Sequence, residues 1–189
     1  VRPSMSSAVS PNYEKTTVDM LGRTIQADRP GFSGVESTQS FYNNLGQLVR
    51  TTTTGQAATL YEYDSVGNQV RSGLDRDASG TLVLNSTDRI ADTNTVFTLI
   101  STSYWQQTTQ MVYAQNNATP TTTGVSRSRL SGFTGGVVDE TVSTDINGNV
   151  TTATTAVNRG TKTQTRTVDV PDSDTNAVSV TVNGLQTSS

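Results

Sequence analysis

YEYDSVGNQVR, residues 61–71, is the stretch that decides the fold, because it predicts two β-strands joined by a tight turn. Tyr61 and Tyr63 are two residues apart, so they share one face of a pleated strand. Asp64 can accept hydrogen bonds from the backbone amides that follow it, and Gly67 supplies the positive φ that such a turn requires. Strand alternation resumes after Gly67, so the stretch is a complete hairpin unit.

The same unit recurs along the chain. Each copy has an Asp or Asn, a Gly three residues later, and an aliphatic residue shortly after that Gly. The first three copies are spaced by roughly 20 residues, as expected of repeats that stack on one another. A looser copy covers residues 77–82. The predicted repeat-turn residues are Asp19 and Gly22, Asn43 and Gly46, Asp64 and Gly67, and Asp145 and Gly148.

These turns resemble the RHS or YD repeat family, whose pattern is Tyr-Asp-x-x-Gly followed by Arg or Asn and then an aliphatic residue. YDSVGN at residues 63–68 matches it best, and residues 16–92 carry the resemblance. Members of that family are large secreted or cell-surface proteins whose hairpins wind into a spiral strip, often closed as a hollow shell. In some bacterial members the shell encloses a toxic segment, and animal relatives act in cell adhesion. The resemblance implies an extracellular or cell-surface location and a structural role more than a reaction.

The predicted fold class is all-β, with stacked hairpins from YD-type repeats forming a curved strip or part of a β-shell. We expect an irregular N-terminal arm at residues 1–15, a YD-type repeat segment at 16–92 and a degenerate β-repeat segment of the same strip at 93–189. Helical periodicity is nearly absent. The chain begins with Val1 and carries no signal peptide, so we interpret it as a piece of a longer protein.

Composition agrees with exposed strands. Of the 189 residues, 32% are hydrophobic and 15% are charged, both below the average for soluble proteins. Thr, Ser, Asn, Gln and Gly make up the difference, and β-branched Thr fits a pleated surface that water reaches. Disordered chains have a similar composition, so it is the strand periodicity that favours a folded β protein.

Charge and residue types exclude several functions. The net charge of −3, without a basic cluster, predicts no nucleic-acid partner, and no segment is long and apolar enough for membrane insertion. The chain has no His and no Cys, which excludes a Ser-His triad, a His-ligated zinc site and a thiol nucleophile within it. Asp139 and Glu140 are adjacent, so they point to opposite faces of a strand and cannot flank one glycosidic bond. We therefore predict that the chain is not an enzyme.

The second half reads as successive strands. Residues 96–105 predict one long strand or two short ones, with residues 108–113 as their partner. Turns or loops are expected at residues 132–136 and 171–176, and Asn183-Gly184 is a hairpin signal. The alternating Thr and charged residues of the tail would bury little, so that strand is either an edge or is covered by another chain. Neighbouring repeats of a longer parent chain, or copies of this chain, are the expected partners.

One loop carries a candidate metal site. DRDASGTL, residues 75–82, has oxygen ligands at positions one, three and five and Gly at six, as in the first half of an EF-hand calcium loop. Ser86 occupies position twelve, where a Glu would be expected, and no helix flanks the loop. The alternative, which we favour, is a repeat turn with surface acids and no cofactor. The candidate calcium ligands are Asp75, Asp77, Ser79 and Thr81, with Asp88 or Asp92 completing the shell.

Two aromatic residues outside the repeats carry the candidate glycan site. If Tyr104 and Trp105 are exposed together, they can stack on a sugar ring, whereas buried they are core, which we favour. Tyr42, Tyr61 and Tyr63 are expected to pack in the core or between repeats.

Three functions follow from these patterns. The first is a structural segment of an RHS or YD-repeat protein that forms a β-scaffold or shell. The alternative is an extracellular carbohydrate-binding or adhesion module, with calcium as an option, or a self-assembling fibre subunit. A carboxylate-dependent enzyme would need two acids converging in a cleft, and no spacing indicates such a pair. We adopt the first interpretation.

Overall fold

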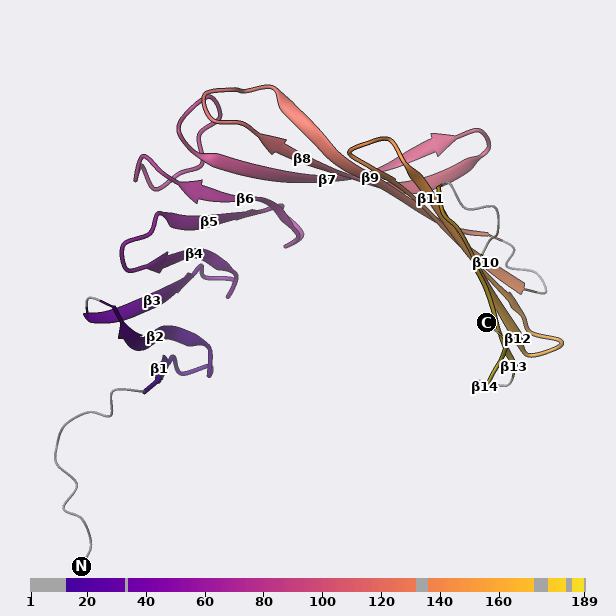
Figure 1. Ribbon diagram of the computed structural model, residues 1–189, viewed down its shortest axis with the longest axis horizontal. Coiled ribbons are helices and arrows are strands. Elements are labelled where there is room, and N and C mark those ends of the chain that lie inside the picture. Colours follow the sequence, from indigo (N-terminus) through magenta and orange to yellow (C-terminus); the bar gives the residue numbers. More distant parts are fainter. Residues whose placement is uncertain (1–12, 33, 132–135, 172–176, 183–184, 189) are drawn as a thin grey trace, which may run out of the picture. The chain divides into compact units, whose positions relative to one another are not determined.

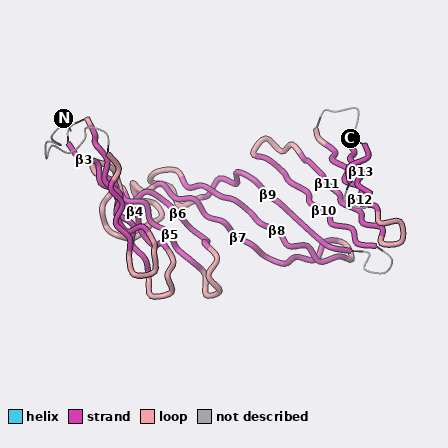
Figure 2. Tube along the Cα trace, turned by 90° about the horizontal axis from the view of Figure 1, so that it is seen from below, coloured by secondary structure: helices cyan, strands magenta, loops and turns pink. Residues whose placement is uncertain are grey.

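The structure is a computed structural model that describes residues 13–32, 34–131, 136–171, 177–182 and 185–188. These residues form fourteen antiparallel β-strands and no helix (Figures 1 and 2). Strand order in the sheet follows chain order, so each strand pairs with the one before it and the one after it. The predicted all-β fold of successive hairpins is confirmed. None of these residues belongs to a helix that could cross a membrane.

The chain divides into two compact units, which we describe separately. The first unit comprises Val1–Ala91 and Tyr113–Thr119, and the second comprises Asp92–Val112 and Pro120–Ser189. The sequence placed a boundary after residue 92, but it did not indicate that residues 113–119 belong with the first part of the chain.

The first unit is a series of short antiparallel strands. The pair β2–β3 is a regular ladder, whereas β1–β2, β3–β4 and β5–β6 each contain a register shift next to a repeat turn. Figure 1 shows these strands side by side in chain order. The strands are β1 (Lys15–Val18), β2 (Thr24–Gly31), β3 (Gly34–Tyr42), β4 (Leu48–Thr53), β5 (Ala58–Tyr63), β6 (Gln69–Asp75) and the start of β7 (Arg89–Ile100).

The second unit has longer strands that continue the antiparallel order. Strands β9 to β12 pair over long ladders, and in one of them Leu130 of β9 lies opposite Asp139 of β10. The remaining strands are β8 (Ser103–Tyr113), β9 (Pro120–Ser131), β10 (Gly136–Asp145), β11 (Val150–Asn158), β12 (Thr163–Asp169), β13 (Ala177–Val182) and β14 (Leu185–Ser188).

Two predicted boundaries need correction. Lys15 already begins β1, so the predicted arm at residues 1–15 is too long by one residue; residues 1–12 lie outside the described part. Residues 103–105 and 108–113 belong to the same strand, β8, whose partner in strand order is β7. The chain turns at residues 101–102, where Ser101 has a φ of 56°. No Gly or Pro marks that turn, which is why the pattern did not separate the two strands.

Several other predicted turns lie wholly or mainly outside the described residues. These are residues 132–136, of which only Gly136 is described as the start of β10, the loop at 171–176, and the turn residues Asn183-Gly184. The strands on either side of Asn183-Gly184, β13 and β14, are paired as antiparallel neighbours.

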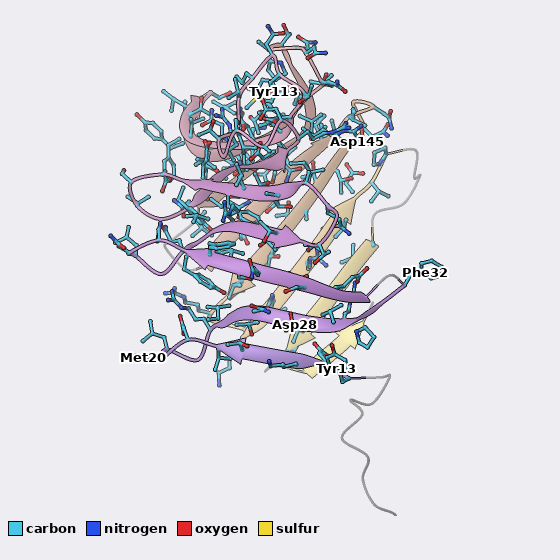
Figure 3. The ribbon with its side chains drawn as sticks, turned by 90° about the vertical axis from the view of Figure 1, so that its left-hand side faces the viewer. Tyr13, Met20, Asp28, Phe32, Tyr113 and Asp145 are labelled. Carbon is cyan, nitrogen blue, oxygen red and sulfur yellow. The ribbon has the colours of Figure 1, made fainter. Side chains whose placement is uncertain are left out.

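The core of the first unit is small. Leu60, Leu82 and Ile90 are its buried members, with exposed fractions of 7%, 7% and 3%. Ala58, Leu84 and Tyr113 pack against them, and Tyr113 reaches this core from the far end of β8. Most other strand side chains of this unit are only partly buried, because they pack against neighbouring side chains on the same face of the sheet. Met20 and Phe32 point outward at turns (Figure 3), where they are fully exposed.

Gly73 allows the strands around this core to approach closely. A Cβ atom at this position would lie 2.4 Å from the carbonyl oxygen of Arg89 and 3.0 Å from the side chain of Leu82. Because β6 carries no side chain here, the start of β7 can lie directly against it. Gly73 is opposite Leu60 in the β5–β6 ladder, so this contact is at the centre of the core.

Candidate functional site

The repeat turns share one hydrogen-bond pattern. In the best copy, the Asp64 Oδ1 atom accepts hydrogen bonds from the amides of Val66 and Asn68 at 3.0 and 2.8 Å. The Gly67 amide donates to the Asp64 carbonyl at 3.2 Å, and Gly67 has a φ of 97°. The same bonds form at Asp19, Asn43 and Asp145, each followed by a Gly with positive φ.

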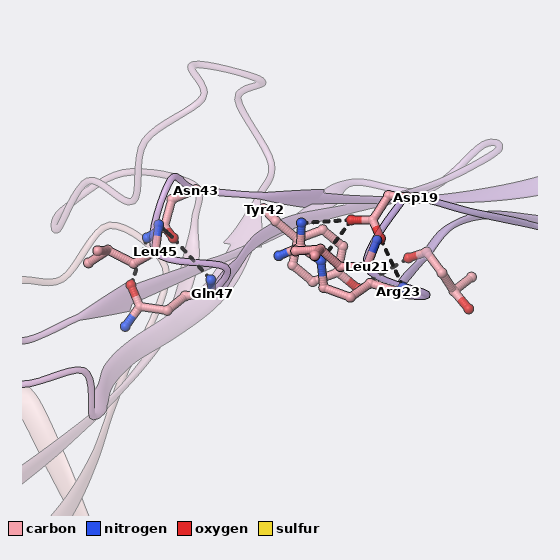
Figure 4. Close-up of polar contacts among 8 residues, drawn as sticks. Asp19, Leu21, Arg23, Tyr42, Asn43, Leu45 and Gln47 are labelled. Carbon is pink, nitrogen blue, oxygen red and sulfur yellow. Dashed lines mark hydrogen bonds and ion pairs between the residues drawn. The ribbon is translucent and has the colours of Figure 1, made fainter.

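A side chain four residues after each Asp or Asn completes the turn. Arg23 donates to Asp19 Oδ2 at 2.7 Å, and Asn68 donates to Asp64 Oδ2 at 3.0 Å. At Asn43 the direction is reversed, because its amide nitrogen donates to Gln47 Oε1 at 2.7 Å. Figure 4 shows the Asp19 and Asn43 turns with these partners. Asp and Asn are therefore interchangeable at this position when the residue four positions later supplies a donor for Asp or an acceptor for Asn.

Two tyrosines link the first three turns to one another. The Tyr42 hydroxyl donates to the Thr24 carbonyl at 3.1 Å, and the Tyr63 hydroxyl donates to the Leu48 carbonyl at 2.8 Å. Each Tyr directly precedes the Asp or Asn of its own turn, and each acceptor follows the preceding Gly by two residues. Equivalent positions therefore make equivalent contacts, as expected of repeats that stack.

In the first two turns, the residue four positions after the Asp or Asn also contacts the next turn. The Arg23 guanidinium lies 4.3 Å from the centre of the Tyr42 ring, and Gln47 Nε2 donates to the Gly67 carbonyl at 3.5 Å. A Cβ atom at Gly46 would lie 3.1 Å from Arg23 Nη1. Glycine at this position therefore supplies the positive φ and also makes room for the neighbouring repeat.

Hydrogen bonds lower the pKa of the turn carboxyl groups. The side-chain amide of Asn68 is the largest cause at Asp64, the side-chain amide of Asn149 at Asp145, and the backbone amide of Arg23 at Asp19. All three causes favour the ionised carboxylate. A group whose pKa is lower in the folded state stabilises that state above its unfolded pKa, and the contribution is lost as pH falls through the folded value.

Acid is therefore expected to destabilise the repeat turns. The midpoint of thermal unfolding should be steady near neutral pH and fall progressively below about pH 4, the unfolded pKa of Asp. Circular dichroism melts between pH 7 and pH 2 measure this. Asp64→Asn should reduce the slope, because Asn keeps the Oδ1 acceptor and does not titrate, and Asn43 already has this role in the second turn. A midpoint that stays constant between pH 5 and pH 2 would contradict the assignment.

The predicted calcium loop contains three clustered carboxylates. Asp75, Asp77 and Asp88 each place an oxygen within 4.8 Å of the others. Asp75 and Asp88 are 5% and 3% exposed. The amides of Ser79 and Gly80 donate to the two Asp75 oxygens at 3.0 and 2.8 Å. Three carboxylates so close could hold a hard cation, and here they also accept hydrogen bonds from the backbone of the loop.

Asp88 is the residue that ties this loop together. Its Oδ1 accepts from the Arg76 amide at 2.9 Å and its Oδ2 accepts from the Val83 amide at 3.0 Å. Asp77 accepts from Ser79, whose side-chain hydrogen bond is the largest cause that lowers the pKa of Asp77. The Ser79 hydroxyl donates to the Thr81 carbonyl at 3.0 Å. Asp92, the other predicted ligand, belongs to the second unit.

The favoured interpretation of this loop, a repeat turn with surface acids, applies only to Asp77, which is exposed and accepts a hydrogen bond from the amide two residues later. Asp75 is buried, and the Gly80 amide donates to the Asp75 carboxylate. In the repeat turns the Gly amide instead donates to the carbonyl of the Asp or Asn three residues earlier. The sequence named Asp88, or Asp92, as a ligand completing a calcium shell, but it did not indicate the hydrogen bonds that Asp88 accepts from the Arg76 and Val83 amides.

Tyr104 and Trp105 do not form a common platform. They are consecutive in β8, so their side chains lie on opposite faces, and they are 71% and 9% exposed. The Arg129 guanidinium covers the Trp105 ring at 4.6 Å from its centre. Arg129 also forms an ion pair with Glu140 at 2.7 Å and donates to the Ser103 hydroxyl at 2.9 Å. Trp105 is thus buried, as favoured, beneath a polar cluster.

Together these features define a class of protein, an all-β chain of stacked hairpin repeats joined through their turns. No protein-family model matches the chain, and no curated protein matches it in sequence. The resemblance to RHS or YD repeats therefore stays a prediction that depends on the turn residues.

Proposed function

We propose that the chain is a structural segment of an RHS or YD-repeat protein, secreted or on the cell surface, in which it forms part of a β-scaffold. The contacts between successive turns carry this proposal. Tyr42 and Tyr63 bind equivalent carbonyls of the preceding repeat, so each repeat completes its neighbour. A scaffold of this kind can lengthen by adding further repeats at its ends. Its partners would be neighbouring repeats of a longer parent chain.

The hydrogen bonds of the turn carboxylates also support a structural role. Asp19, Asp64 and Asp145 direct both carboxylate oxygens at groups of their own turn. Calcium is not part of this proposal, because backbone amides that donate to Asp75 and Asp88 account for the burial of these carboxylates without a metal.

Assembly into a fibre has less support than the scaffold. Within the described residues β1 pairs with β2 alone, and it is four residues long, exposed at every position and begins with Lys15. Short edge strands with a Lys oppose pairing with another sheet.

An inserted repeat tests the proposal. A second copy of residues 43–63 placed between Tyr63 and Asp64 restores a Tyr before an Asp or Asn at both junctions. We expect a folded chain whose urea m-value rises, because each molecule exposes more surface on unfolding. Urea unfolding followed by circular dichroism measures this.

A matched control insertion tests whether the added residues stack as a repeat or are only accommodated as an unstructured loop. It carries the same residues, but with alanine at the positions that copy Asn43 and Gly46. This control should leave the m-value near that of the original chain, because the added segment lacks its turn. If the intact insertion instead unfolds the protein, or matches the control, the repeats are not modular and the scaffold proposal fails.

A further inference from the structure

A groove crosses four neighbouring strands of the second unit. Its cavity volume is about 470 Å³, within the usual range for small-ligand sites of about 300–1,000 Å³. Strands β7 to β10 contribute to it, and Figure 1 shows β7, β8 and β9 side by side. Its lining residues are Phe97, Tyr104, Gln106, Ser128, Leu130 and Asp139, together with Arg129, whose guanidinium is held over the Trp105 ring and paired with Glu140.

The two faces of these strands differ in how their side chains are used. On one face Arg129 joins Trp105, Glu140 and Ser103 into a closed cluster. On the groove face, Phe97 and Tyr104 are 76% and 71% exposed. Exposed aromatic side chains gathered in one place mark a binding surface more often than chance.

Polar groups in the groove are also free to bind a ligand. Among the residues that the structure describes, the Asp139 carboxylate and the Gln106 amide have no side-chain hydrogen bond or ion pair, unlike Glu140 on the other face. Asp139 lies opposite Leu130 across the β9–β10 ladder, so it is at the rim of an apolar surface. The groove thus combines aromatic rings with an unused hydrogen-bond acceptor and an amide that can both donate and accept.

This combination matches the chemistry of a sugar. A pyranose ring presents C–H groups on its face, which pack on an aromatic ring, and hydroxyl groups at its edge, which donate to carboxylates and amides. A strand surface suits an extended ligand. A β-1,4-linked chain of equatorial sugars is extended with flat faces, whereas an α-1,4-linked chain coils. Asp139 would repel an anionic sugar and accept from a neutral one.

We infer that this groove binds a neutral β-1,4-linked oligosaccharide, with Tyr104 and Phe97 stacking on the sugar rings and Asp139 and Gln106 binding hydroxyl groups. The site differs from the one that the sequence indicated, because Phe97 replaces Trp105 as the second aromatic residue. It is independent of the repeat turns, so it can be present whether or not the scaffold proposal holds.

Isothermal titration calorimetry with cellohexaose, chitohexaose and maltohexaose tests the inference. We expect cellohexaose or chitohexaose to bind and the α-1,4-linked maltohexaose to bind at least tenfold more weakly. Tyr104→Ala should weaken binding about tenfold, because it removes a stacking ring. Asp139→Asn should have a smaller effect, since the amide oxygen can still accept.

Phe32→Ala is the matched control. Phe32 is an even more exposed aromatic residue, but it lies in a turn of the first unit, so binding should not change. Circular dichroism of each variant confirms that the fold is retained. The inference is overturned if neither β-1,4-linked probe binds or if Tyr104→Ala binds as tightly as the original chain. It is equally overturned if sedimentation shows a dimer that Tyr104→Ala dissociates, because a second copy then occupies the groove.

Discussion

Gly73→Ala is expected to lower the free energy of unfolding by about 3 kcal/mol, at the upper end of the usual range for overpacking. The new methyl group would lie 2.4 Å from the Arg89 carbonyl oxygen, closer than real Cβ contacts allow. A backbone atom cannot rotate away as a flexible side chain can. The segment at Arg89 must therefore move, and that movement would disturb Leu60 and Ile90, which pack in the same core.

Urea unfolding followed by circular dichroism measures this loss, and Gly124→Ala is the matched control. Gly124 also lies in a strand, but a Cβ atom there would be 3.5 Å from the Thr144 carbonyl oxygen, an ordinary contact. Its replacement should be neutral or slightly stabilising, since alanine restricts the unfolded chain. If both variants lose the same stability, the close approach at Gly73 has no special role.

Ile90→Ala is expected to cost about 2–5 kcal/mol, because it removes buried methyl groups and leaves a cavity. Ile90 is 3% exposed, the lowest exposure among the core side chains of the first unit. That core is small, with only Leu60 and Leu82 as its other buried members. Few neighbouring side chains can therefore shift to fill the space.

Leu74→Ala is the control for this second experiment. Leu74 is in β6 beside Gly73 and is 39% exposed, so its truncation should cost about 1 kcal/mol or less. Both variants can be compared by urea unfolding at the same pH. Equal losses for Ile90→Ala and Leu74→Ala would mean that the buried cluster is not the main source of stability in this unit.

The turns could be predicted because their interactions are local. Asp64 bonds to the amides of Val66 and Asn68, within four residues, so the motif itself contains every partner. The same holds at Asp19, where Arg23 supplies the closing group. The hairpin order and the absence of helix among the described residues follow from these turns and from the alternation between them.

The candidate sites could not be predicted to the same extent. Asp88 closes the acid loop through the Arg76 amide, twelve residues away, and no motif joins the two. The missing turn signal at Ser101 hid the β7–β8 hairpin, so Phe97 was not placed near Tyr104. Tyr113 was expected on a strand that pairs with residues 96–105, whereas it continues the strand of Trp105 and packs in the core of the first unit.

By itself, the sequence determined the four repeat turns and the alternating segments between them, because both depend on contacts within a few residues along the chain. Only the tertiary structure decided which side chains are buried together and which are left exposed. Tyr104 and Trp105 are the clearest example, since the pattern shows that they point apart but not which face is covered. That depends on Arg129, Glu140 and Ser103, which reach the Trp105 face from other positions in the chain.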